Sequence, residues 1–476
     1  MSDEENDFGF GRLSLRPNTP SPQPNVNIRD TESYGRAAQA SASGPSTLTS
    51  VVVPPSDNNV DNLNWNTAMA RSDSQLAGYM AAHPAEQNII EAKMNLFLWN
   101  KPLEAVNRRR PFAERRSAEA AKYSSLEPYG ITILADIASG VEATTYLIER
   151  SQVEFVMRVS KTGDTAGDTR DVAKHVLMER LRERYPQAMR NVIQMVDYQR
   201  LQSLDMRRYG DTYQGERIIQ ILEKAGVTLM KQFTEIVDTP SVQSGGINAF
   251  LVSTFTQLFC QLHYLHLFLN EFEHWDLHWK NIMFRPAYPL EIDPNGHFDY
   301  VIQIAPGTTD PNGTSAPSFR IHVPTEWTNG ELVKIIDLGW TKLRYHAQDP
   351  TNGATTEQQL NSAKLERNFR PRDYRQDALL TTHWFVEFCK TEFSTKPDVL
   401  EARAGRVLRA LARLSSKIQN LPDSQSTDRF LVATLLRTDP FFQAVRDPIT
   451  SATPVDMPSL EAVTKVPLIQ GLVSAN

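Results

Sequence analysis

The segment from Ile247 to Leu269 constrains the fold most, because it runs for the length of a bilayer span without one fully charged residue. It also carries eight polar side chains, each of which is costly in hydrocarbon without a hydrogen-bonding partner. These are Asn248, Ser253, Thr254, Thr256, Gln257, Gln261, His263 and His266. We therefore predict a helix buried in the middle of a large domain, and no contact with a membrane.

The charge balance and the two cysteines exclude several classes of protein. The net charge of −6 is too mild for a surface that coats nucleic acid. Cys260 and Cys389 are too few for a disulfide framework or a four-thiolate zinc site. The first residues, MSDEEND, are acidic where a secretory signal would be basic and then apolar. We expect an intracellular protein that binds no nucleic acid directly, and the choice between nucleus and cytoplasm stays open.

The first quarter of the chain differs in composition from the rest. Residues 1–62 are rich in Pro, Ser and Asn and poor in large apolar side chains, which predicts a disordered tail. Residues 63–125 are predicted to form a helical, basic extension with an amphipathic helix over 86–99. The basic residues between Lys101 and Arg116 fit a solvated helix face better than a nuclear-import patch.

From Tyr129 the pattern changes to short β-type runs, followed by mainly helical sequence beyond Gly245. The expected strands lie within 131–137, 144–148, 153–159, 192–198 and 217–222, and a helix is expected over 171–184. A small sheet with one helix, followed by a larger helical body, predicts an α+β chain with two lobes. The lobes are placed at 126–225 and 226–446, with a tail over 447–476.

The residues that point to chemistry follow the uncharged helix. His274 to Phe284 reads H-W-D-L-H-W-K-N-I-M-F, and Val333 to Gly339 is an apolar strand that ends in D-L-G. Phosphoryl transfer needs one carboxylate to orient the attacking hydroxyl and accept its proton, and an Asn and a second carboxylate to hold Mg²⁺ against nucleotide phosphates. Asp276 and Asn281 have the D-x-x-x-x-N spacing of a protein-kinase catalytic loop, and Asp337 stands where the Asp of D-F-G would. The pattern predicts a site for ATP and magnesium.

Two other interpretations of this segment remain open. His274, Asp276 and His278 alternate, so on a strand they would share one face and could ligate zinc. That interpretation leaves Asn281 and the D-L-G turn unexplained. The segment could also be a buried polar turn without chemistry.

On these motifs the sequence resembles the protein-kinase superfamily over residues 129–390, and within it the haspin-type kinases. Asp276 to Trp279 matches the haspin D-L-H-W run. The insertion at 285–332 is also shared, and it carries two strand-like runs at 300–304 and 319–323.

A further segment, Asp373 to Asp377, reads D-Y-R-Q-D and resembles the haspin D-Y-x-x-D segment that replaces A-P-E. The resemblance implies that Asp377 braces the catalytic loop from the following helix. It also implies a bilobal protein-kinase-like fold, transfer to Ser or Thr hydroxyls, and a protein substrate that is basic or histone-like. The usual H-R-D arginine is Trp275 here, which predicts activity without an ordering phosphate.

The glycine-rich loop and the phosphate-contacting lysine are only partly present. The loop aligns with Ala138 to Ala143 and keeps Gly140 alone. The V-A-I-K lysine aligns with Arg158, which keeps the charge but is longer and planar. Lys161 is a fallback phosphate contact, although it falls on the opposite strand face and fits a solvated strand end better.

The helix over 171–184 should supply a glutamate that pairs with Arg158. Val172, Val176, Glu179 and Glu183 form one stripe of that helix. Glu179 is the expected partner because it lies mid-helix, and Glu183 is the alternative. Either could instead pair with a neighbouring surface arginine.

The strand over 217–222 is followed by Glu223-Lys224-Ala225-Gly226, which resembles a kinase hinge. Backbone groups between Glu223 and Ala225 would then meet adenine. The alternative is an apolar strand that ends in a turn.

Three functions compete on these observations. The first is an active Ser/Thr protein kinase with Asp276 as base, Asn281 and Asp337 on magnesium, and phosphates met by Arg158 and the Gly140 loop. The second is a pseudokinase scaffold, since Arg158 and the eroded loop would impair transfer. The third is a kinase for a small-molecule hydroxyl, because a similar loop occurs in such enzymes.

Overall fold

The computed structural model describes eleven stretches of the chain. They are residues 130–139, 143–150, 152–160, 165–201, 217–305, 318–348, 355–360, 373–422, 425, 427–447 and 466–467. The expected tail at 1–62, the extension at 63–125, Gly140 and Lys161 lie outside the described residues.

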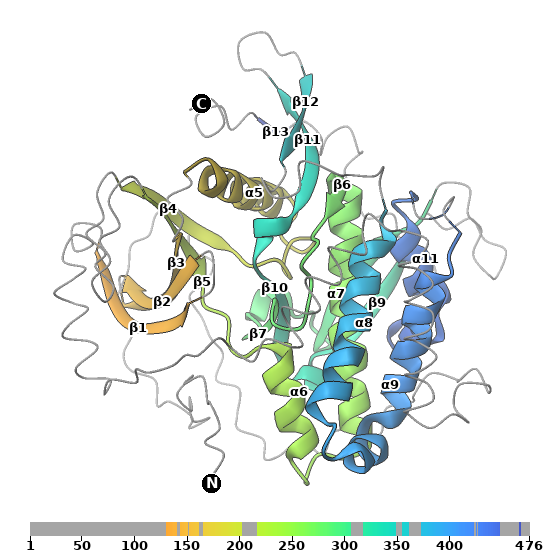
Figure 1. The fold of residues 1–476 in the computed structure, drawn as a ribbon. Helices are drawn as coiled ribbons and strands as arrows, with labels where there is room; N and C mark the ends of the chain where they lie inside the picture. Colours follow the sequence, from red (N-terminus) through yellow and green to blue (C-terminus); the bar gives the residue numbers. More distant parts are fainter. Residues whose placement is uncertain are drawn as a thin grey trace.

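A five-stranded antiparallel sheet lies on one side of the molecule, in the order β1-β2-β3-β5-β4 (Figure 1). Its strands are β1 Ile131–Ser139, β2 Ala143–Arg150, β3 Val153–Ser160, β4 Met195–Leu201 and β5 Arg217–Glu223. All five expected strands are confirmed. β4 begins three residues later than expected, because Val192 makes a separate bridge to Ile335 outside the sheet.

One long helix, α5 Thr165–Arg184, packs on this sheet against β4 and β5. Val172 of α5 is buried with Met195 and Ile218, while side chains such as Met157 and Ile221 form a cluster of their own. Strand side chains alternate between faces. Arg158 stands opposite Gln220 in the β3–β5 pairing, so it lies on the face that carries Ile218 and α5.

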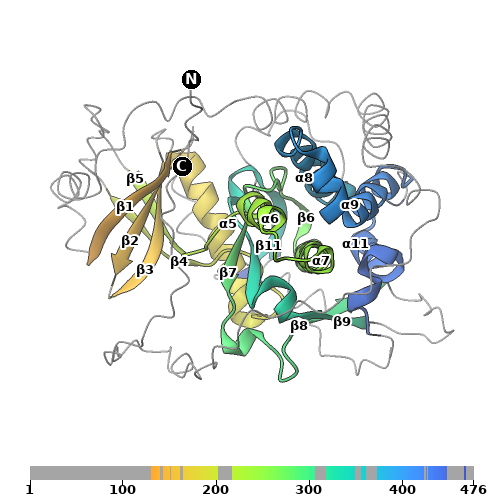
Figure 2. The same cartoon turned by 90° about the horizontal axis from the view of Figure 1, so that it is seen from below.

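The rest of the described chain is mainly helical. Its helices are α6 Leu229–Asp238, α7 Ser244–Phe268, α8 Arg375–Glu392, α9 Pro397–Gln419 and α11 Leu431–Thr438. Figure 2 shows α7 at the centre, surrounded by the other helices and by a β-hairpin. Every residue of α7 from Gly246 to Phe268 is buried, which confirms the expected central helix. None of the described helices is both long and apolar enough to cross a membrane.

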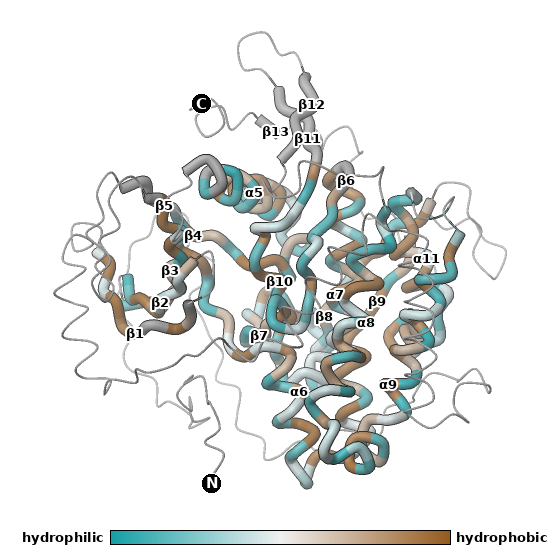
Figure 3. Tube along the Cα trace, viewed as in Figure 1, coloured by the Kyte–Doolittle hydropathy of each residue, from teal (hydrophilic) through white to brown (hydrophobic). Residues whose placement is uncertain are grey.

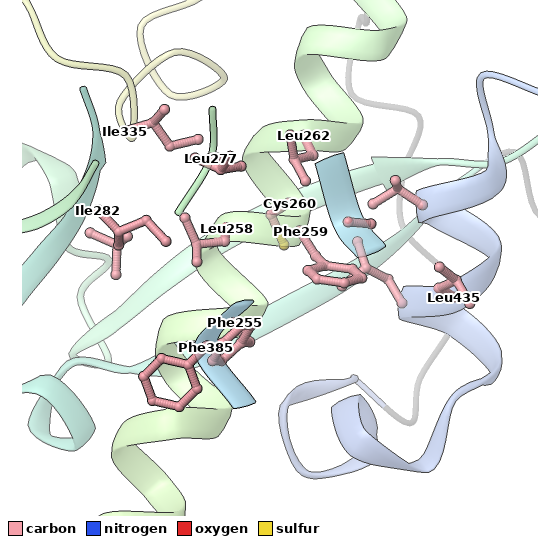
Figure 4. Close-up of a cluster of buried hydrophobic side chains, with 14 of the residues drawn as sticks. Phe255, Leu258, Phe259, Cys260, Leu262, Leu277, Ile282, Ile335, Phe385 and Leu435 are labelled. Carbon is pink, nitrogen blue, oxygen red and sulfur yellow. The ribbon is translucent and has the colours of Figure 1, made fainter. Parts of the chain in front are cut away.

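Aromatic and aliphatic side chains from distant parts of the sequence meet around α7. Figure 4 shows Phe255, Phe259 and Phe385 in this cluster. The ring centroids of Phe255 and Phe385 lie 5.3 Å apart in an edge-to-face contact, a favoured aromatic geometry. Hydrophilic and hydrophobic residues alternate along α9 (Figure 3), as expected for a helix with only one face on this core.

Short strands and 3₁₀ turns connect the helices. The strands are β6 Asn270–Glu273, β7 Ile282–Pro286, β8 His297–Gln303, β9 Ser318–Pro324, β10 Glu331–Ile335, β11 Lys342–Gln348, β12 Thr355–Leu360 and β13 Val466–Pro467. The turns are η3 Pro289–Glu291, η4 Thr325–Thr328, η5 Leu338–Trp340 and η7 Pro440–Val445. β7 pairs with β10, and β6 pairs with β11. β8 and β9 pair as an antiparallel hairpin, which confirms the two strand-like runs expected in the insertion.

The sheet and the helical body are joined directly after β5. Gly226 N donates to Phe284 O at 2.6 Å, and Phe284 N donates to Val227 O at 3.0 Å. A Cβ at position 226 would lie 3.0 Å from Phe284 O, so this close approach of two backbones favours glycine. The connection is therefore anchored to β7, at the end of the segment that carries Asp276 and Asn281.

Candidate active site

The segment that carries Asp276 is a loop between β6 and β7 rather than a strand. The alternation required for a zinc site is therefore absent. His274 Nε2 lies 3.2 Å from Ile336 O, and His278 Nδ1 accepts from Lys280 N at 3.1 Å. Among the described residues, no group of three or more His, Cys, Asp and Glu side chains could hold a metal ion. The zinc interpretation is not supported here.

Asp377, in the first turn of α8, holds the start of this loop. Its carboxylate accepts hydrogen bonds from His274 N at 2.7 Å and Trp275 N at 3.0 Å, and its side chain is 2% exposed. Trp275 has a φ of 61°, an uncommon conformation for a bulky residue. The two bonds stabilise this strained turn, so the bracing role expected for Asp377 is confirmed by its contacts.

A second carboxylate lies on the other side of the turn. Glu273 Oε2 accepts from Trp275 Nε1 at 2.5 Å, and Glu273 Oε1 accepts from Asp373 N at 3.3 Å. The pKa of Glu273 is raised to about 7, chiefly by burial and also by the nearby charge of Asp377, against the opposing effect of Lys342. The indole N–H of Trp275 is thus bonded to a buried carboxylate.

Asp276 and Asn281 are in direct contact. Asn281 Nδ2 donates to the Asp276 carbonyl at 2.9 Å and to Asp276 Oδ2 at 3.1 Å. Both side chains are less than a tenth exposed. These bonds fix the amide so that Asn281 Oδ1 is the atom able to ligate a cation. His278 Nε2 lies 3.8 Å from Asp276 Oδ2 on the same loop.

Asp337 enters the same region from the end of β10. Its φ of 57° and ψ of 78° are left-handed, and its Oδ1 accepts from Gly339 N at 3.2 Å. Ile336 N donates to Asn281 O at 3.0 Å, which joins the two segments one residue before Asp337. Burial alone would raise the pKa of Asp337, yet Arg158, the Gly339 N–H and the nearby histidines together lower it. The surroundings of Asp337 therefore favour the ionised form of its carboxylate.

The Arg158 side chain, on β3, lies close to Asp337. Its Nη1 lies 3.4 Å from Asp171 Oδ2. Burial lowers the pKa of Arg158, but Asp337 and Asp171 more than compensate, and the net change is upward. The structure therefore brings Arg158, Asp276, Asn281 and Asp337 into one region, although Arg158 precedes the other three in the sequence by more than a hundred residues.

The helix partner of Arg158 differs from the expectation. Glu179 accepts from Arg182 Nε at 3.0 Å and from Met195 N at 3.0 Å, so it ties α5 to β4. The predicted pairing of Arg158 with Glu179 is wrong, because the Glu179 carboxylate is bound by Arg182 and Met195, whereas Arg158 pairs with Asp171. α5 begins at Thr165, before the expected start. Two turns nearer that start, Asp171 occupies the position facing Arg158. The side chain of Glu183, the alternative partner, lies outside the described residues.

Lys174 was missed by the sequence reasoning. Its side chain is fully buried, and its Nζ contacts Leu338 O at 3.1 Å, Gly339 O at 3.0 Å and Asp171 Oδ1 at 3.3 Å. Burial lowers the pKa of Lys174, and Asp171 opposes that change. The only sequence signal was the i, i+3 spacing of Asp171 and Lys174, which is common on solvated helix faces as well.

Glu223 and Ala225, in the segment expected to contact adenine, have different surroundings. The Glu223 carboxylate is buried between Lys334 Nζ at 2.6 Å and Arg285 Nε at 2.9 Å, and Glu223 N donates to Gln194 O at 2.9 Å. Burial raises the pKa of Glu223, but the two cations outweigh it and the net change is downward. Within the described part of the chain, the N–H and carbonyl of Ala225 make no hydrogen bond, so they can receive a ligand.

No protein-family model matches this chain, and no curated protein matches it either. The case for a function therefore rests on the residues and their geometry.

Proposed function

We propose that this chain is an ATP-dependent protein kinase that transfers the γ-phosphate to Ser or Thr hydroxyls. The observation that carries the proposal is the convergence of Asp276, Asn281 and Asp337, with Arg158 beside Asp337. These are the residue types that phosphoryl transfer requires, in the order and spacing of a kinase catalytic loop and metal-binding turn.

The arrangement of the elements supports the same proposal. A five-stranded sheet with one long helix is followed by a mainly helical body built around a buried central helix (Figure 1). The proposed bilobal kinase-like fold accounts for both parts and for the connection through Gly226. It also accounts for the loop-bracing carboxylate of Asp377.

Each site residue has a role in the proposed reaction. Asp276 would orient the acceptor hydroxyl and take its proton, since the carboxylate lies next to Asn281 and is fixed by the same loop. Asn281 Oδ1 and the ionised Asp337 would hold magnesium, which takes most of its other oxygen ligands from phosphates and water. When bound there, the ion would supply positive charge against the charge that develops on the phosphates. Arg158 would face the phosphates, and the free backbone of Ala225 would meet adenine.

The substrate class follows from the resemblance to haspin-type kinases, which implies a basic or histone-like protein.

One observation favours a second function, a pseudokinase scaffold. The Arg158 guanidinium is already paired with Asp171 and adjacent to Asp337, so its charge is partly neutralised before any phosphate binds. A scaffold would keep the braced loop and bind nucleotide weakly or not at all. A small-molecule kinase is the third candidate, with the same catalytic residues.

Transfer from labelled ATP tests the proposal. The full chain would be incubated with Mg²⁺ and with histones and other basic proteins as acceptors, beside an Asp276→Asn variant that keeps the shape of the side chain. Label on protein that disappears in the variant establishes a protein kinase. No label, together with stabilisation by ATP and Mg²⁺, favours a pseudokinase or a small-molecule kinase. If the chain neither transfers phosphate nor binds nucleotide, only the scaffold function remains.

A further inference from the structure

The Lys174 ammonium group connects α5 to the D-L-G turn. A lysine donates three hydrogen bonds, and Lys174 Nζ has three acceptors within 3.3 Å. Two of them are the carbonyls of Leu338 and Gly339, in the turn that follows Asp337. The third is Asp171, which also pairs with Arg158 through its other oxygen.

Because all three N–H donors of Lys174 have protein acceptors, one of two roles for this residue is favoured. A lysine that replaced the missing strand-three lysine would need a donor left for phosphate. Lys174 has used its three donors on protein acceptors, and its side chain is 0% exposed. It therefore fits a residue that positions the turn, whereas Arg158 is the cation that faces the phosphates.

The turn that Lys174 holds is conformationally demanding. Asp337 is in the left-handed region, and its Oδ1 is fixed by Gly339 N. A Cβ on Gly339 would lie 3.1 Å from Asp337 Oδ1 and 3.6 Å from Asp171 Oδ2, so the turn packs closely on α5. Left-handed backbone at a residue other than glycine persists only where its surroundings stabilise it.

We infer that Lys174 is a positioning residue: with Asp171 it latches α5 to the D-L-G turn and so presents Asp337 to magnesium. The inference rests on the proposed function, because Asp337 is a magnesium ligand only if the site binds a metal–nucleotide complex. Groups that orient metal ligands affect metal affinity strongly, commonly by about 10- to 100-fold when removed. Loss of the latch should therefore weaken magnesium binding more than nucleotide binding.

The test compares Lys174→Met with Lys334→Met in the full chain. Lys334 is a second buried lysine, 1% exposed, and its described partners are Glu223 and Val192 O. Both variants lose one buried ammonium, so a general loss of stability affects both. We expect Lys174→Met to raise the Mg²⁺ concentration for half-maximal transfer by about tenfold or more. Stabilisation by ADP without Mg²⁺ should change less than twofold, and Lys334→Met should keep the wild-type Mg²⁺ dependence.

An unchanged Mg²⁺ dependence in Lys174→Met overturns the inference, as does an equal change in Lys334→Met. If Lys174→Met does not fold, Asp171→Asn weakens the latch from the other side and keeps the shape of the side chain; the same increase is expected, and its absence overturns the inference.

A wild-type protein that transfers no phosphate would contradict the proposed kinase but not the latch. In that case thermal stabilisation by ADP and Mg²⁺ is measured in place of phosphate transfer. If Lys174→Met loses only the extra stabilisation that Mg²⁺ adds to that by ADP, the latch is supported. If Mg²⁺ adds nothing to ADP binding in the wild type, both proposals fail.

Discussion

Asp377 offers the sharpest test of how the loop that carries Asp276 is held. Asp377→Asn keeps the size of the side chain but replaces one acceptor oxygen with an NH₂ group. The two N–H groups of His274 and Trp275 that now point at the carboxylate lie at 2.7 and 3.0 Å. In the variant, one of them would face another donor in a buried environment.

The magnitude follows from these two bonds. A hydrogen bond to a charged group contributes about 1.5–3 kcal/mol, and a buried donor left unpaired costs about 1–3 kcal/mol. One bond is lost, and the other is weakened because its acceptor is neutral. A partial offset comes from Glu273, since removal of the Asp377 charge relieves a repulsion that raises the pKa of Glu273. We expect a net loss of about 3 kcal/mol, a large part of the roughly 5–15 kcal/mol that stabilises most proteins.

Urea unfolding followed by circular dichroism measures this loss. The control is Asp398→Asn, an exposed carboxylate in the first turn of α9, where about 0.3–1 kcal/mol is expected from the helix dipole. Phosphate transfer should fall with Asp377→Asn, because the loop that carries Asp276 loses its fixed geometry. A variant as stable as the Asp398→Asn control, with transfer unchanged, would refute the bracing role.

Two further predictions concern buried charges. Burial raises the pKa of Glu273 to about 7 from an ordinary 4.5, so the folded protein keeps a proton that the unfolded chain releases. The free energy of unfolding should therefore fall as the pH rises from about 4.5 to about 7, and Glu273→Gln should flatten that slope in urea titrations at several pH values. Glu223→Gln removes the counter-charge of the buried Lys334 ammonium, and we expect a loss of about 3–5 kcal/mol by urea unfolding. A loss below about 1 kcal/mol would show that Lys334 finds another partner or loses its proton.

Local patterns predicted much of the fold. The β-type runs between Ile131 and Leu222, the helix that contains Ile247 to Leu269, and the hairpin within 285–332 all follow from periodicity and turn residues. Such features are encoded within a few residues of one another, so a single sequence can reveal them. The contacts of Asp377 with His274 and Trp275 are different, because they join residues about a hundred positions apart and were implied only by the resemblance to haspin-type kinases.

The partners on α5 could not be predicted in this way. The expected pairing placed Glu179 opposite Arg158, but Asp171, about two turns earlier on α5, is in that position. Lys174 binds carbonyls more than 160 residues away, and a backbone carbonyl leaves no mark in the sequence. The buried ion pair of Glu223 with Lys334 is equally long-range. These contacts depend on how the sheet and the helical body pack, which a short window of residues does not contain.

The pairing of Arg158 with Asp171 changes what the absent lysine means. Arginine is longer than lysine, and aspartate is one methylene shorter than glutamate, so an Arg–Asp pair spans the gap from strand to helix much as a Lys–Glu pair would. In the proposed kinase, the site would then be built around Arg158 rather than damaged by it, which is the opposite of what the pseudokinase interpretation takes from the same pair. Arg158→Lys alone should leave the cation short of Asp171 and lower kcat/KM by about tenfold, a loss of about 1.4 kcal/mol of transition-state stabilisation.

The double variant Arg158→Lys/Asp171→Glu should recover most of that loss, because the added methylene restores the reach. Asp171→Glu alone should also lower kcat/KM, since the longer acid is crowded against Arg158 and Lys174. Steady-state transfer by the four proteins completes the cycle. A strong rise in turnover in Arg158→Lys alone would contradict the argument, because it would mean that the native site is impaired by its arginine and that the pseudokinase interpretation is the better one.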